Sequence, residues 1–335
     1  MSFINEVKSE LAGAESEKDC CALSELSAIL RSAGSIVLRR AEAETADTGV
    51  GAEIAGESPY ACDKAEKIIG RYFGGTCKRT VKNRGGRMVY TAALPECEAG
   101  RILAECGILG RGDYGLLTLQ TGIDGYVVME PCCGAAYVRG ALLAAGYISV
   151  PGDESVTPAA PAASGYQMEF VLSDEAHASA VCRLLARAGI PSKTTERAGR
   201  SVVYLKSAQA ISDALAFAGA PSAVCRLNGI IATRDMRNAL VRQSNCIRAN
   251  IDKSVAAAVG QAERIKAYLS VNPPESLPLR LREAAFLRAE NPELSIAELA
   301  GAADFPITKS GLVHRLRKLD EIITDDKCRM TNIDY

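Results

Sequence analysis

Several absences limit what this chain of 335 residues can do. It contains no run of 18 apolar residues, so the sequence predicts no membrane-spanning helix and no membrane partner. The opening segment, MSFINEVKSELAG, is charged and amphipathic and lacks the apolar core of a signal peptide, so we expect a cytoplasmic protein. The formal net charge is only -1, so any attraction to nucleic acid must come from a local patch.

The 12 cysteines lack the spacing of a zinc site. No C-x-x-C is present, and the two histidines supply no second pair of ligands beside the cysteines. We therefore expect no metal and no cofactor. In a reducing cytosol the cysteines should be thiols that pack as small apolar side chains. Two pairs are vicinal, Cys20–Cys21 and Cys132–Cys133, which leaves redox or metal sensing as an alternative.

What is present is an internal repeat. The segment Cys20–Ile36, CCALSELSAILRSAGSI, aligns without a gap with Cys132–Ile148, CCGAAYVRGALLAAGYI, at an offset of 112 residues. A duplicated helix at this separation indicates two related half-domains that face each other across a pseudo-twofold axis. Each copy also places two small residues four apart on one face, which would let the two helix backbones approach closely. These small residues are Ala28 and Ser32 in the first copy and Gly140 and Ala144 in the second.

Periodicity and turn signals predict similar elements in both halves. In the first half we expect helices at 21–33, 62–73 and 96–106, and strands at 35–40, 50–54, 78–82 and 87–92. In the second half we expect helices at 132–145, 174–188 and 208–217, and strands at 166–172, 193–197 and 201–205. The stretch 149–165 is rich in proline, alanine and glycine, which predicts a flexible surface insertion.

After Ala220 the chain becomes basic and helical in pattern. Between Arg226 and Lys266 eight Lys or Arg residues stand against three acids, which is the kind of patch that neutralises phosphates. No proline or glycine interrupts the stretch from Ile230 to Val259. We therefore interpret 223–272 as a basic helical linker, followed by a DNA-binding domain at 273–325 and a tail at 326–335.

The last domain has the pattern of a helix-turn-helix. The segment Ser295–Glu298 forms a capping box that opens a short helix, and Gly301–Pro306 supplies a turn. Thr308 can cap a second, basic helix over Lys309–Leu319. Three leucines of that helix are expected in the core, namely Leu312, Leu316 and Leu319.

These residues resemble two known families. Leu26–Gly34 and Val138–Gly146 are similar to degenerate LAGLIDADG motifs, whose family folds as a saddle of two αββαββα halves. Over essentially its whole length the chain resembles the WhiA family of bacterial sporulation and cell-division regulators, from the opening FINEVKSELAG to TKSGLVHRLRK at Thr308–Lys318. The resemblance implies an α+β fold, with a pseudo-twofold LAGLIDADG-like saddle over 1–222 (halves about 1–110 and 125–222) before an all-α helix-turn-helix domain.

The same resemblance bears on catalysis. Active LAGLIDADG enzymes place an acidic residue just before the last glycine of each motif, and the two carboxylates hold Mg²⁺ on the scissile phosphate. Here Ala33 and Ala145 occupy both positions, and a methyl group cannot bind a metal ion. We therefore expect a scaffold without catalytic residues rather than a nuclease or another enzyme.

Two sets of residues are predicted to bind double-stranded DNA, through base edges and phosphates. On the recognition helix they are Thr308, Lys309, Ser310, Val313, His314, Arg315, Arg317 and Lys318, with a solvated basic helix face as the alternative. On the linker they are Arg237, Asn238, Arg242, Asn245, Asn250 and Lys253, with intramolecular docking of the linker as the alternative. Other basic residues form either a rim of the saddle or an ordinary exposed strand surface. They are Arg139, Lys193, Arg197 and Arg200, and the hairpin residues Lys78, Arg79, Lys82, Arg84 and Arg87.

The sequence as a whole predicts a DNA-binding transcriptional regulator, and the resemblance to the WhiA family implies that it acts on sporulation or cell-division genes. It would act at promoter regions in the nucleoid, with another transcription regulator as a candidate protein partner. The alternative is a nucleoid-associated or protein-interaction scaffold in cell division or chromosome segregation. Selectivity for promoter-like sites would separate the two.

Overall fold

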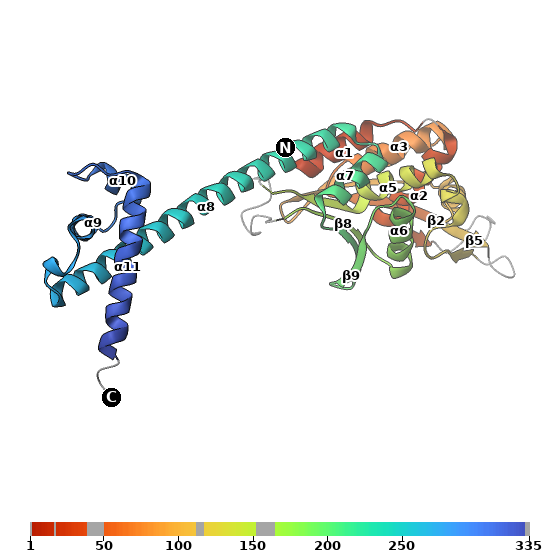
Figure 1. The fold of residues 1–335 in the computed structure, drawn as a ribbon. Coiled ribbons are helices and arrows are strands. Elements are labelled where there is room, and N and C mark those ends of the chain that lie inside the picture. Colours follow the sequence, from red (N-terminus) through yellow and green to blue (C-terminus); the bar gives the residue numbers. More distant parts are fainter. Residues whose placement is uncertain (1, 17, 39–49, 112–116, 152–164, 332–335) are drawn as a thin grey trace. The chain divides into compact units, whose positions relative to one another are not determined.

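The computed structural model describes residues 2–16, 18–38, 50–111, 117–151 and 165–331, and the side chains among them as far as residue 326. The chain divides into two compact units, Met1–Thr233 and Arg234–Tyr335 (Figure 1). No helix of the described residues is long and apolar enough to cross a membrane. The finer domain boundaries expected from the sequence stay predictions.

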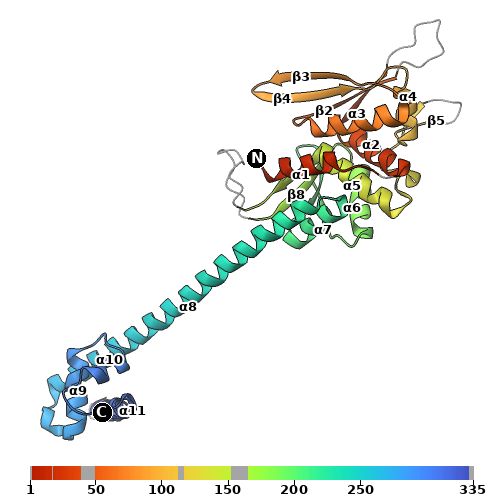
Figure 2. The same cartoon turned by 90° about the horizontal axis from the view of Figure 1, so that it is seen from above.

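In the first half of the first unit, helices pack against one four-stranded antiparallel sheet (Figures 1 and 2). Its sheet has the order β1-β2-β4-β3, with Ile36 opposite Ala52 and Thr80 opposite Thr91. Buried alternate residues of β2, such as Ile54, turn toward the helices. The elements are α2 (Asp19–Ala33), β1 (Gly34–Leu38), β2 (Val50–Gly56), α3 (Tyr60–Phe73), β3 (Lys78–Arg84), β4 (Arg87–Ala93) and α4 (Ala99–Glu105).

The second half repeats this topology, with the sheet order β7-β8-β10-β9. Its elements are α5 (Pro131–Ala145), β7 (Gly146–Ser149), β8 (Gln167–Leu172), α6 (Glu175–Arg187), β9 (Lys193–Arg197), β10 (Arg200–Leu205) and α7 (Ala208–Ala218). Both halves therefore have the αββαββα order that the family resemblance implies, and the predicted fold class is confirmed. Strand β7 was not among the strands expected from periodicity.

Local chemistry explains the turns. The β3–β4 hairpin reverses at Gly85 and Gly86, with φ of 59° and 86°, and the β9–β10 hairpin reverses at Ala198 and Gly199, with φ of 51° and 71°. Two consecutive residues at positive φ match the right-handed twist of paired strands, and glycine reaches this region without strain. Both hairpins were expected from these residues.

Three further parts of the first unit were not expected. Helix α1 (Phe3–Gly13) buries Phe3, Val7 and Leu11, which are spaced four apart on one face. A two-stranded sheet of β5 (Leu109–Arg111) and β6 (Leu117–Leu119) and the 3₁₀ turn η2 (Gly125–Val128) stand between the halves in sequence. The insertion predicted at 149–165 falls mostly outside the described residues, and Ser149 itself belongs to β7.

A helix of 51 residues, α8 (Pro221–Val271), covers residues 223–271 of the predicted linker. The second unit continues with η3 (Pro274–Ser276), α9 (Leu279–Glu290), α10 (Ile296–Gly301) and α11 (Lys309–Thr331). Its core joins Ile265 of α8 to residues of α9, α10 and α11, including the buried Leu299. The expected end of the last helix at Leu319 is wrong: the next residues contain no glycine or proline, and α11 continues to Thr331.

Candidate nucleic-acid interface

The two repeat helices, α2 and α5, pack against each other in the middle of the first unit (Figures 1 and 2). Small residues make the contact close, as the sequence indicated: a Cβ added to Gly140 would lie 2.3 Å from the carbonyl oxygen of Glu25 and 3.0 Å from the Cβ of Ala28. The backbones therefore touch, and the ends of both helices are fixed relative to each other.

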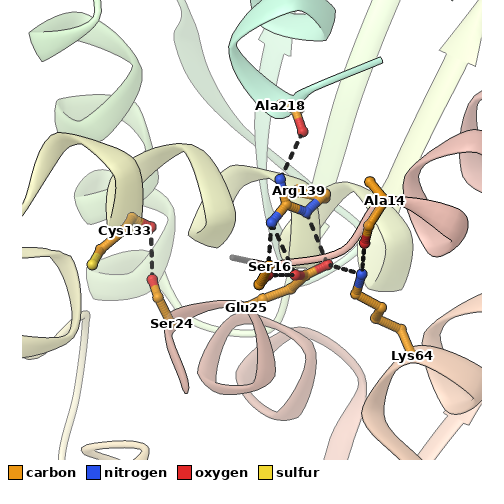
Figure 3. Close-up of polar contacts among 8 residues, drawn as sticks. All are labelled: Ala14, Ser16, Ser24, Glu25, Lys64, Cys133, Arg139 and Ala218. Carbon is orange, nitrogen blue, oxygen red and sulfur yellow. Dashed lines mark hydrogen bonds and ion pairs between the residues drawn. The ribbon is translucent and has the colours of Figure 1, made fainter. Parts of the chain in front are cut away.

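A buried ionic network crosses this contact (Figure 3). Arg139 of α5 donates from Nε to Glu25 Oε1 at 3.0 Å and from its terminal nitrogen to Oε2 at 3.1 Å. Lys64 of α3 lies 3.5 Å from the same carboxylate and donates to the carbonyl of Ala14. Burial lowers the pKa of Lys64, whereas the charge of Glu25 raises it.

Arg139 is therefore not a residue of an exposed rim, and the prediction that it is one is wrong. Only 11% of its side chain is exposed, and it also donates to Ser16 at 3.0 Å and to the carbonyl of Ala218 at 3.3 Å. A buried ion pair whose donors and acceptors are satisfied this fully is expensive to break, because either partner would be left as an uncompensated buried charge. Arg139 and Glu25 hold the two halves together.

A cavity of about 1020 Å³ opens where the two repeat helices end, which is where a nuclease of this fold would carry its carboxylates. Ala33 and Ala145 both line it. Among the described lining residues the charged ones are the cations Lys8, Arg31, Arg87 and Arg200 and the single carboxylate Glu57. The described lining therefore has a positive balance and lacks the pair of carboxylates that would hold Mg²⁺.

The cations of this cavity are held to different degrees. Arg31 donates to the carbonyls of Gln120, at 2.9 Å, and Gly107, so its guanidinium is anchored to the protein. Burial lowers the pKa of Lys8 to about 8, against the opposing effect of Glu57. An anion in the cavity would stabilise the protonated form of Lys8 and so raise its pKa again.

The other basic residues of the saddle differ in exposure. Arg79 is half-buried and pairs with Asp63 at 2.6 Å and Glu66 at 3.0 Å, so it fastens β3 to α3. Exposed positions on the two hairpins are Lys78, Lys82, Arg84, Lys193 and Arg197, besides Arg87 and Arg200 of the cavity. Of these, Arg197 lies 3.4 Å from Glu169. The exposed set stays a prediction for DNA contact.

In the second unit the helix-turn-helix is built as its local signals indicate. Ser295 and Glu298 form the capping box at the start of α10, and the Thr308 hydroxyl accepts the Gly311 N–H at 3.2 Å at the start of α11. Leu312, Leu316 and Leu319 are buried, which confirms their expected place in the core. The opposite face of α11 is left for solvent or a ligand.

Seven of the eight predicted contacts on this helix are exposed, namely Thr308, Lys309, Ser310, Val313, His314, Arg317 and Lys318. Arg315 is the exception: its side chain is 20% exposed and lies 3.2 Å from Glu283 of α9. Its guanidinium also donates to the Arg280 carbonyl at 3.3 Å and stacks on Phe305 at 5.3 Å from the ring centre. The structure thus gives Arg315 a bracing role between α9 and α11.

The six predicted contacts on α8 are all exposed. With 100° per residue, Asn238, Arg242, Asn245 and Lys253 share one face, and Arg237 and Asn250 lie to either side of it. The opposite face carries apolar side chains that sequence reasoning missed, because the segment was judged by its charge. This apolar stripe consists of Met236, Leu240, Ile247 and Ile251, all exposed. Its successive members are four, seven and four residues apart, and this helical spacing in the sequence could have revealed the stripe.

The residues that could hold a metal lie elsewhere, at the N-terminal ends of α2 and α5. The Sγ atoms of Cys20, Cys21, Cys132 and Cys133 all lie within 4.8 Å of one another. Burial raises the pKa of Cys133 to about 11 and that of Cys21 further still, while a hydrogen bond from Cys21 lowers the pKa of Cys132. The sequence separated these pairs by 112 residues, and the fold brings them together.

Comparisons with known proteins agree with this arrangement. The family model for the WhiA LAGLIDADG-like domain matches residues 134–237, and that for the WhiA C-terminal HTH domain matches residues 240–323. A relative from Heliobacterium modesticaldum, named probable cell division protein WhiA, is 32% identical over 326 residues and covers 96% of both chains. The chain belongs to the WhiA family.

Two further WhiA proteins support the assignment. The protein of the same name from Bacillus subtilis is 33% identical over 327 residues, again covering 96% of each chain. The crystal structure of full-length WhiA from Thermotoga maritima is 19% identical, covers 97% of this chain and 98% of its own, and superposes with a TM-score of 0.55. At that identity the structure supports the WhiA fold and nothing finer.

Proposed function

We propose that this chain is a DNA-binding transcriptional regulator of sporulation or cell-division genes, located in the cytoplasm at the nucleoid. The observation that carries the proposal is the exposed face of α11, where Lys309, Ser310, His314 and Arg317 stand free of the core while three leucines anchor the helix. A recognition helix needs one buried face and one exposed polar face, because side chains at its N-terminal end read base edges in the major groove.

The remaining cations would add phosphate contacts. The polar face of α8 joins two positive charges, Arg242 and Lys253, to the amides of Asn238 and Asn245, a mixture that suits phosphate oxygens. Ala33 and Ala145 supply no metal ligand, so we propose that the saddle binds without cleaving.

Affinity measurements on full-length protein test the proposal. Fluorescence anisotropy with genomic promoter fragments across a salt series should show Lys309→Ala and Arg317→Ala each weakening binding by about 1–3 kcal/mol if they read bases, or reducing the salt slope by about 1 if they hold phosphates. Arg280→Ala is the matched control, because Arg280 is an exposed cation of the same unit on α9.

Two results would count against this function. Affinity and salt slope that match the Arg280→Ala values in both α11 variants would place the DNA-binding surface elsewhere. Binding that is equal on promoter and random fragments would remove the regulatory part of the proposal, because selectivity defines a regulator.

A second candidate function is a protein-interaction scaffold in cell division, and the apolar stripe on α8 favours it. Exposed apolar side chains aligned on a helix are the usual signature of a partner helix or groove. Leu240→Glu with Ile247→Glu would then abolish function in cells while leaving DNA affinity unchanged. Loss of DNA affinity in this variant would argue against a separate partner surface.

A further inference from the structure

Both cysteine pairs occupy the same place in their helices. Cys20 and Cys21 are the second and third residues of α2, and Cys132 and Cys133 are the second and third residues of α5. Because α2 and α5 pack about the pseudo-twofold axis, their first turns meet, and the four Sγ atoms converge within 4.8 Å of one another. A twofold arrangement of two adjacent thiols yields four ligands around one point.

The spacing of the sulfurs suits a single metal ion. With a Zn–S bond of about 2.3 Å, the four sulfurs of a tetrahedral site lie about 3.8 Å apart. The observed limit of 4.8 Å leaves only small side-chain rotations to reach that geometry. A [4Fe–4S] cluster binds each thiolate to a different iron atom and therefore needs a wider spacing than a single ion. Four sulfurs around one centre are typical of zinc.

The surroundings also suit a closed site with a way in. Cys21 and Cys133 are 7% and 2% exposed, whereas Cys20 is exposed and Cys132 half-buried, so an ion could enter from the side of the last two. Within the described residues neither helix has a side-chain N-cap. Cys21 and Cys133 already donate their N–H groups to the carbonyls of Lys18 and Glu130. The positive end of each helix therefore remains to stabilise thiolates.

A hydrogen bond just behind the thiols supports their position. Ser24 of α2 is buried and donates its hydroxyl to the carbonyl of Cys133 at 2.7 Å (Figure 3). It fixes one helix against the other beside the cluster. Such outer contacts orient metal ligands and are part of most built sites.

We propose that Cys20, Cys21, Cys132 and Cys133 bind one Zn²⁺ ion that joins the two halves of the saddle. On binding, the four thiols release their protons to solvent and four Zn–S bonds form, which gives a site of charge −2 with no change of oxidation state. With four protein ligands the ion has no open position for a substrate, so its role is structural. The ion cross-links the starts of α2 and α5 and thereby sets the angle between the halves.

Metal analysis of full-length protein, purified in reducing buffer without chelator, tests the proposal. We expect about one zinc per chain, as for a structural site. The variant Cys20→Ser with Cys132→Ser changes the two most accessible ligands and little packing, and it should contain no zinc above background. The control variant Cys97→Ser with Cys246→Ser removes two exposed thiols outside the cluster and should keep one zinc.

Cobalt substitution gives a second readout that does not depend on the yield of zinc during purification. Co²⁺ added to chelator-treated wild type and to the control variant should produce the visible absorption of a tetrahedral thiolate site, and the Cys20/Cys132 variant should not. The proposal is overturned by absence of both zinc and the cobalt spectrum in wild type, or by iron in place of zinc. Zinc retained in full by the Cys20/Cys132 variant, or disulfides joining the two pairs in freshly purified protein, would also overturn it.

Discussion

Replacement of Gly140 by alanine tests the contact on which the pairing of the halves depends. The added Cβ would lie 2.3 Å from the Glu25 carbonyl oxygen and 3.0 Å from the Ala28 Cβ. Neither atom can rotate away, because the first belongs to the helix backbone and the second is fixed to it. The helices would have to separate by about 1 Å to restore ordinary contact, in an interior that is close-packed.

The size of the effect follows from two opposing terms. Overpacking of a core costs about 1–3 kcal/mol, and alanine in mid-helix returns up to about 1 kcal/mol over glycine. Separation would also stretch the hydrogen bonds of 3.0 and 3.1 Å between Arg139 and Glu25. The cost of overpacking should therefore lie near the upper end of that range. We expect a net destabilisation of about 2 kcal/mol, or a fall in Tm of about 4–8 °C for a unit of this size.

Thermal and urea unfolding of the full-length protein, followed by circular dichroism, would measure this loss. Gly229→Ala is the matched control: Gly229 is exposed in α8, and no atom lies within 4 Å of an added Cβ. That variant should gain up to about 1 kcal/mol from helix propensity. A Tm for Gly140→Ala at or above the wild-type value would refute the reasoning from close approach.

Two further perturbations address buried charge. His177 is 1% exposed, and burial lowers its pKa to about 4 from 6.5. Because the pKa in the folded state is the lower one, the contribution of neutral His177 to the free energy of unfolding is fully present above pH 6.5. It falls by about 3 kcal/mol as the pH drops to 4. Urea midpoints measured from pH 7 to pH 4 should show this decline, and His177→Asn should flatten it; an equally steep decline in the variant would contradict the assignment. Glu25→Ala leaves two buried cations without their carboxylate and should cost about 3–5 kcal/mol. Glu105→Ala breaks only the exposed pair with Arg101 and should cost less than about 1 kcal/mol. Equal losses of stability in the Glu25 and Glu105 variants would contradict the argument.

The elements that could be predicted from the sequence are those with short-range signals. The repeated segment at 20–36 and 132–148 reveals two like helices, and the glycines at 85–86 and 199 mark the hairpins. Ser295 and Glu298 define a cap within four residues. In each case the deciding interaction lies within one turn of helix or one hairpin, so composition and spacing are sufficient.

The residues that escaped prediction have their partners far away in the chain. Arg139 binds Glu25 across 114 residues, and Arg315 binds Glu283 across 32. From sequence alone a basic side chain at a surface-like position and one in a buried pair look the same, because only the packing decides its partner. The cysteine cluster was accessible in principle: two vicinal pairs at equal places in two helices related by a twofold axis must converge or lie symmetrically apart.

The alanines at the ends of the two motifs affect how the contact between α2 and α5 is stabilised. Two carboxylates brought together at the ends of packed helices repel each other unless a cation lies between them, so a nuclease of this fold needs its metal partly to hold its own helices. With Ala33 and Ala145 that repulsion is gone, and the helices are held instead by the Gly140 contact and by the Glu25–Arg139 pair. The first unit can therefore keep the saddle shape without a metal at the ends of the two motifs. Four cations and one carboxylate line the cavity there, and Glu57 already pairs with Arg87 at 3.0 Å, so the described lining suits an anion better than a metal cation.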